Sequence, residues 1–146
     1  MKIPVEINGK TVTIELTEDQ VALVKKHTGK ITDRIKTFQD VLEYIGPKRA
    51  KQFDDSCENC SDHNIADKQI ELICEVLNEG WVADPFNTSQ IKYYPYFQVS
   101  SSAFVFYYYY SWCQFTDVSS RLCFKNSDLA IYAGKQFIDI YNKLLS

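Results

Sequence analysis

The stretch AFVFYYYYSW, residues 103–112, restricts the fold of this chain more than any other part of the sequence. It is aromatic at most of its positions and contains four consecutive tyrosines. Aromatic and β-branched residues favour strands, in which alternate side chains face opposite sides of the sheet. We therefore expect a strand here. Its less polar face, suited to packing beneath a helix, should carry the even-numbered residues Phe104, Phe106, Tyr108, Tyr110 and Trp112.

Period-two patterns before and after this stretch predict two further strands, near residues 91–99 and 118–125. Three serines at 100–102 suit a hairpin connection between the first two strands. Apolar residues at helical spacing predict helices over residues 65–79 and 127–145, the second opened by Asn126 or Ser127. The expected core is an antiparallel sheet of about three strands packed on these two helices.

The N-terminal part of the chain carries a separate set of local signals. Asn8-Gly9 lies between two alternating runs within residues 2–16, which predicts a β-hairpin. Thr17, followed by Gln20 three residues later, predicts the start of a helix that ends near His27. We expect residues 1–29 to form an appendage to a core domain at residues 30–146.

The beginning of the core domain is expected to hold one short helix and one long loop. Thr37 is a plausible N-cap for a helix that ends at Gly46-Pro47. Residues 47–63 are polar and have no apolar period, so a loop is predicted there. Together with the sheet and the later helices, these elements give an α+β fold.

Composition and charge exclude several classes of protein. The chain has 146 residues, of which 45% are hydrophobic and 24% charged, as in ordinary globular domains. No apolar run approaches the roughly 20 residues of a spanning helix, and the N-terminus lacks a secretory apolar region, so we expect no membrane contact and a cytoplasmic location. A net charge of -3 opposes tight binding to a phosphate backbone, which makes nucleic acid an unfavoured partner.

The three expected strands each have one apolar face and one mixed face. If the mixed faces share one side of the sheet, they form a basic, tyrosine-rich surface made of Lys92, Tyr94, Tyr96, Tyr107, Tyr109, Arg121 and Lys125. Such a surface could bind a small anionic or nucleotide-like ligand, with Arg121 holding the charge while Tyr107 or Tyr109 stacks on a ring. The alternative is an ordinary outer face that meets water or is covered by the N-terminal hairpin, and base rates favour it.

The segment Cys57-Glu58-Asn59-Cys60 has the spacing of half a zinc site, with His63 close behind. A structural zinc site usually shows two such pairs, so an exposed loop with incidental thiols is favoured and no metal is expected. The chain has two histidines, His27 and His63, and no glycine-rich phosphate loop. We therefore expect neither a cofactor nor enzymatic activity, and a metal-dependent enzyme built around this segment is the minority hypothesis.

Several blocks in order, VLNEGW, KYYPYF, SSRLCFK and LAIYAGKQFIDIY, together with ITDRIKTFQDVLEYIG, resemble an uncharacterised family of small proteins from bacteriophages and mobile elements of Bacteroidetes. The resemblance covers about residues 30–145 and does not include the Cys57–Cys60 segment. It implies a phage or mobile-element origin and a bacterial host cytoplasm as the location. It transfers no functional residue, because no activity is established for the family.

These observations favour a non-enzymatic binding protein that acts on a host component or sequesters a small nucleotide-like anion. Two alternatives remain open at this point. One is a virion or assembly component that binds other phage proteins or its own copies, since a tyrosine-rich strand could bury its second face against another copy. The other is a single-stranded nucleic-acid binding protein that stacks bases on the same tyrosines.

Overall fold

The computed structural model describes residues 2–7, 9–20, 28–113 and 120–146 of the chain. They fall into two compact units, Met1–Arg34 and Ile35–Ser146, where the sequence led us to expect a division between residues 29 and 30. The secondary structure confirms the α+β class. None of the described helices has the length and apolar character needed to cross a membrane.

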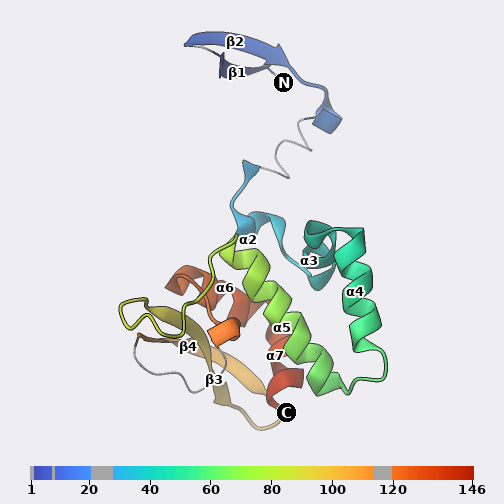
Figure 1. The fold of residues 1–146 in the computed structure, drawn as a ribbon, viewed down its shortest axis with the longest axis vertical. Coiled ribbons are helices and arrows are strands. Elements are labelled where there is room, and N and C mark those ends of the chain that lie inside the picture. Colours follow the sequence, from blue (N-terminus) through green and yellow to red (C-terminus); the bar gives the residue numbers. More distant parts are fainter. Residues whose placement is uncertain (1, 8, 21–27, 114–119) are drawn as a thin grey trace. The chain divides into compact units, whose positions relative to one another are not determined.

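The first unit contains the predicted hairpin, formed by β1 (Lys2–Ile7) and β2 (Lys10–Glu15) (Figure 1). The strands are antiparallel, and Val5 pairs with Val12. Gly9 has a φ of 73°, the positive value that the predicted turn requires. Thr17 and Gln20 exchange backbone-to-side-chain hydrogen bonds of 3.0 and 3.3 Å, which confirms the predicted helix start. Residues 21–27, which carry most of that helix as predicted, lie outside the described residues, and the short helix α2 (Ile31–Arg34) follows.

The second unit begins with α3 (Phe38–Ile45), which confirms the helix predicted from Thr37. The Thr37 hydroxyl accepts a hydrogen bond from the Asp40 amide, and the Asp40 carboxylate accepts one from the Thr37 amide. The long loop predicted at 47–63 is wrong, because Pro47–Cys57 form helix α4. Proline fits the first turn of a helix, where its missing N–H is not needed, so Pro47 starts α4 as well as following the end of α3.

Three more helices complete the second unit. Helix α5 (Asp62–Asn78) begins at its N-cap Ser61, a few residues before the predicted start, and is followed by Gly80 with a φ of 87°. The single helix predicted at 127–145 is divided at Phe137 into α6 (Ser127–Gln136) and α7 (Ile138–Leu145). The side chain of Asn126 caps α6 by accepting from the Leu129 amide, which settles the choice between the two expected caps.

Strands β3 (Lys92–Val99) and β4 (Phe104–Trp112) form the predicted antiparallel hairpin. The third strand expected at 118–125 does not form in the described part of that segment. Ser120–Leu122 make a short 3₁₀ helix, η1, and Phe124 makes one isolated bridge to Tyr93, whereas residues 118 and 119 lie outside the described residues. The buried Asn78 side chain holds the other side of this segment: its amide donates to the Cys123 carbonyl at 2.8 Å and its oxygen accepts from the Lys125 amide at 2.9 Å.

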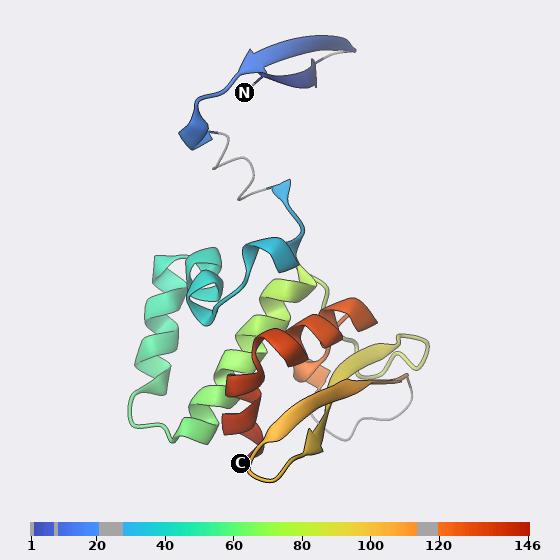
Figure 2. The ribbon, with the colours of Figure 1, turned by 180° about the vertical axis from the view of Figure 1, so that it is seen from behind.

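The helices of the second unit form a layer against one side of the hairpin. Helices α6 and α7 pack on β3 and β4, α7 also packs on α5, and α3 and α4 lie on the far side of α5 (Figures 1 and 2). The sequence led us to expect α5 directly on the sheet, but its main partner is α7. Ile70, Ile73 and Leu77 of α5 are fully buried with Phe124, so α5 supplies the centre of the core.

Candidate interaction surface

A β-bulge divides the tyrosine-rich hairpin into two parts. Tyr96 pairs with Tyr108, but the next residue, Phe97, pairs with Phe106, so Tyr107 is an extra residue on β4. An extra residue reverses the alternation of side chains along its strand. Phe106 therefore lies on the face of Phe97, and Tyr108 on the face of Tyr96.

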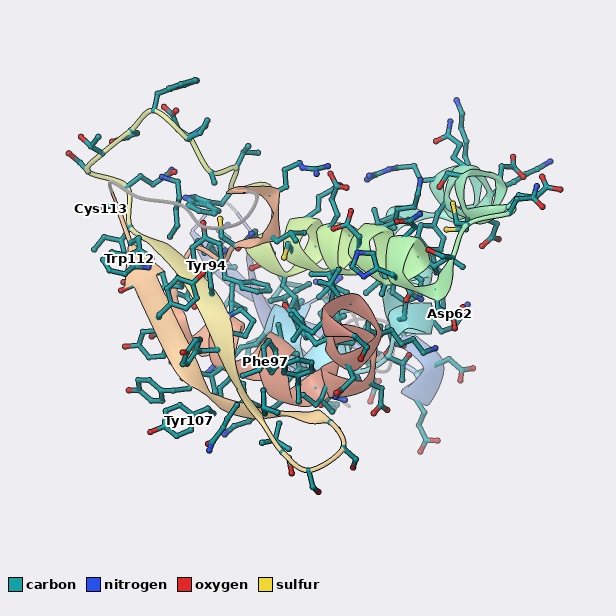
Figure 3. All side chains as sticks on the ribbon, turned by 90° about the horizontal axis from the view of Figure 1, so that it is seen from below. Asp62, Tyr94, Phe97, Tyr107, Trp112 and Cys113 are labelled. Carbon is teal, nitrogen blue, oxygen red and sulfur yellow. The ribbon has the colours of Figure 1, made fainter. Side chains whose placement is uncertain are left out.

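This reversal corrects the prediction that all even-numbered residues of β4 pack beneath a helix. Phe97 packs on Tyr141 of α7 at a ring separation of 4.7 Å, and the ring of Phe106 lies edge-on to that of Phe97 at 6.2 Å. Beyond the bulge, Tyr108 and Trp112 are exposed. Figure 3 shows Phe97 on the side of the helices, and Tyr107 and Trp112 on the outer side of the hairpin.

The exposed rings form one surface, which we name the tyrosine face. Its members are 45–64% exposed: Tyr96 54%, Tyr107 64%, Tyr108 55% and Trp112 45%. The Tyr96 ring lies 6.4 Å from that of Tyr107 and 5.9 Å from that of Tyr110, which in turn lies 6.5 Å from Trp112. Tyr108 stacks on its neighbour Tyr109 at 4.6 Å. Strand β4 contributes most of this face and has no charged residue.

Of the four tyrosines in the predicted ligand surface, two lie together on the tyrosine face. Tyr96 and Tyr107 are in ring contact, as described above. Tyr94 is buried and stacks on Tyr110 at 5.0 Å, so it is not open to a ligand at the outer face. Tyr109 contacts Tyr93 at 5.8 Å, and Tyr93 lies on the opposite face of β3 from Tyr96.

The three predicted cations do not join these tyrosines. Lys92 is buried, and its ammonium donates to the Gln90 carbonyl at 3.3 Å. Arg121 belongs to η1 and forms a 3.0 Å ion pair with Glu71 of α5. Lys125 donates to the Asn78 carbonyl at 3.2 Å and lies 3.5 Å from the Glu79 carboxylate. The prediction of one basic, tyrosine-rich face is therefore wrong, because it assumed unbroken alternation and a third strand.

The structure also contains a pocket that the sequence did not indicate. It has a volume of about 260 Å³ and lies between the hairpin and α7, with Tyr94, Phe97, Tyr141 and Leu145 among its lining residues. The Tyr141 hydroxyl is buried without a hydrogen-bond partner among the described residues, and burial raises its pKa well above the usual value. Tyr141, Leu144 and Leu145 have the spacing of one helix face, which indicates packing and gives no sign of a pocket.

The two cysteines of the half zinc motif lie at the end of α4 and in the turn after it. The Cys60 amide donates to the Cys57 carbonyl at 3.0 Å, and the Cys60 thiol donates to the Ser56 carbonyl at 3.4 Å. His63 is exposed in the first turn of α5. In the described ranges, no three His, Cys, Asp or Glu side chains are close enough together to hold a metal ion.

Two further cysteines, Cys74 and Cys123, are buried in the core. Burial raises the pKa of the Cys123 thiol to about 11 and raises that of Cys74 as well. Both thiols are therefore protonated at neutral pH, where a reactive cysteine would be a thiolate. They pack as small apolar residues.

Comparison with known proteins finds no matching protein-family model, no matching curated protein and no matching solved structure.

Proposed function

We propose that this chain is a non-enzymatic binding protein of bacteriophage or mobile-element origin, and that the tyrosine face is the surface with which it binds a host or phage protein. The observation that carries the proposal is the exposure of four aromatic side chains on one strand pair whose β4 has no charge. Tyrosine and tryptophan are enriched in protein interfaces, where they supply large apolar area and a polar tip. Contiguous exposed apolar surface on a domain commonly marks an interaction site.

A protein partner suits this surface better than the small anion considered from the sequence. Arg121, the residue expected to hold the anion, pairs with Glu71, and the pocket beside it is also lined by Glu75. An anion would have to displace these carboxylates. On the tyrosine face itself, the hydroxyls are neutral at physiological pH, as tyrosine hydroxyls ordinarily are. The neighbouring Tyr109 raises the pKa of Tyr108 further. The face therefore offers neutral hydroxyl donors and apolar rings.

The test compares two sets of exposed aromatic residues. We expect the tagged full chain, expressed in cells that carry its natural element, to retain one protein, and Tyr107→Ser with Tyr108→Ser to reduce that recovery by about tenfold or more, as interface anchors do. Phe86→Ser is the matched control, because Phe86 is 90% exposed in the loop before β3. This control should leave recovery unchanged.

Three results would overturn the proposal. The first is equal recovery of the partner by the double variant and the wild type. The second is a small anionic molecule, released on denaturation, as the bound species. The third is steeply salt-dependent binding to a labelled oligothymidylate, which would replace the protein partner with single-stranded nucleic acid.

A further inference from the structure

The outer edge of β4 carries backbone groups that point away from the hairpin. Tyr93 of β3 exchanges two hydrogen bonds with Phe124, of 3.1 and 2.8 Å, so its polar groups point away from β4. In an antiparallel pair, the residue directly opposite Tyr93 on β4 then points its own N–H and C=O away from β3. That residue is Ser111. Two positions along, Tyr109 lies opposite Pro95, so the N–H and C=O of Tyr109 also point away from β3.

Other stretches of the hairpin edges are closed by specific groups. On β3, Phe124 pairs with Tyr93, and Pro95 has no N–H to offer. On β4, the Asn142 side chain accepts from the Phe104 amide at 2.7 Å and donates to the Phe104 carbonyl at 2.9 Å. Within the described part of the chain, Tyr109 and Ser111 have no such backbone partner on the outer side of β4.

The open stretch also lacks the features that protect exposed strand edges. Charged side chains and prolines usually prevent edges from pairing with other strands. Strand β4 has neither over Phe104–Trp112, in a chain whose net charge is -3. The edge is therefore neutral, and two copies of it meet without the repulsion that acidic surfaces would impose.

We propose that two copies of this chain pair along the edge, β4 against β4, antiparallel about a two-fold axis at Tyr110. Tyr109 of each copy then faces Ser111 of the other, so the outward groups satisfy one another reciprocally, as a two-fold interface requires. Every strand has outward groups at this spacing, and a second copy is the proposed occupant because its edge has the same open groups and no charge. The closure of Phe104 by Asn142 and the bulge at Tyr107 confine the pairing to the open stretch.

This pairing goes beyond the proposed function, because it is made by backbone groups, and it places Tyr108 opposite Trp112 of the other copy where the two tyrosine faces meet. A two-fold axis perpendicular to the sheet keeps corresponding faces of the two copies on the same side. The dimer would therefore present two tyrosine faces next to each other on one four-stranded sheet. The pairing and the binding of a partner can be measured separately.

The test is the molar mass of the full chain, measured by light scattering at high micromolar concentration. We expect twice the 16.9 kDa of one chain. Ser111→Lys places one charge of each copy near the other at the paired edge and should raise the dimer dissociation constant by about tenfold or more. Val99→Lys adds the same charge at an exposed site on β3 and should leave the dissociation constant unchanged.

A second variant separates loss of pairing from loss of folding. Ser111→Pro removes the outward N–H without removing a bond between β3 and β4, so it should weaken the dimer while the far-ultraviolet circular dichroism stays that of the wild type. A wild-type monomer at this concentration would overturn the proposal. A dimer that survives both Ser111 substitutions would also overturn it. Either result would leave unchanged the loss of partner recovery expected for the Tyr107→Ser, Tyr108→Ser double variant, so the two proposals can fail separately.

Discussion

At the scale of single residues, Asn78 fixes the segment after η1 to the end of α5. Its side chain is buried at the C-terminal end of α5 and forms hydrogen bonds on both sides of Phe124, to the Cys123 carbonyl and the Lys125 amide. Phe124 uses its own amide and carbonyl for the bridge to Tyr93, so the two groups that Asn78 binds point away from β3. One amide side chain thus satisfies the outward backbone groups of this segment and joins α5 to the segment that bridges to β3.

Asn78→Ala should lower the free energy of unfolding by about 2–3 kcal/mol, because it leaves two backbone groups without their partners, one of them on buried Cys123. Urea unfolding followed by circular dichroism measures the change. Asn64→Ala, at an exposed position on the same helix, is the control and should change stability by less than about 0.5 kcal/mol. Equal effects of the two substitutions would contradict the role assigned to Asn78.

At the scale of elements, a glycine sets the distance between α6 and the hairpin. A Cβ at Gly134 would overlap the Phe106 ring and would lie 2.8 Å from the Pro95 side chain. These contacts are too short for carbon atoms. Gly134 therefore lets α6 approach the hairpin closely, at a position where helix propensity alone would favour alanine.

Gly134→Ala should destabilise the protein by about 1–3 kcal/mol despite the higher helix propensity of alanine, because the added methyl group overpacks the contact with Phe106. The same substitution made together with Phe106→Leu should cost less, since the smaller side chain leaves room. A double-mutant cycle from urea unfolding measures this difference. If the two substitutions are additive, the close packing of α6 on Phe106 does not limit stability.

Local signals predicted most of the elements, because the groups that define them are close in sequence. The capping of α3 by Thr37 and of α6 by Asn126 could both be predicted in this way. Helix α4 could not, because it has little apolar surface. It is held by contacts with other helices, namely the ring contact of Phe53 with Phe38 at 5.1 Å and the ion pair of Arg49 with Glu75 at 2.7 Å.

At the scale of the whole molecule, the composition of the candidate site could be predicted but its geometry could not. The excess of tyrosine in residues 93–112 is visible in the sequence. The bulge at Tyr107 is not, because the register of two strands depends on packing across the sheet. The burial of Lys92 and the pairing of Arg121 with Glu71 depend on contacts between segments that are distant in sequence. The position of the predicted cations could therefore not be foreseen.

The central claim is that the tyrosine face binds another protein, and photocrosslinking from single positions tests it most directly. We would place p-benzoylphenylalanine at position 107, on the tyrosine face, and at position 86 in separate chains, and irradiate cells that carry the natural element. Both positions carry an exposed aromatic residue in the natural chain, so the two crosslinkers differ only in whether they lie on the tyrosine face. We predict a discrete product with a different protein from position 107 and none from position 86. Products of equal yield from both positions, or only products of the chain with itself from position 107, would contradict the claim.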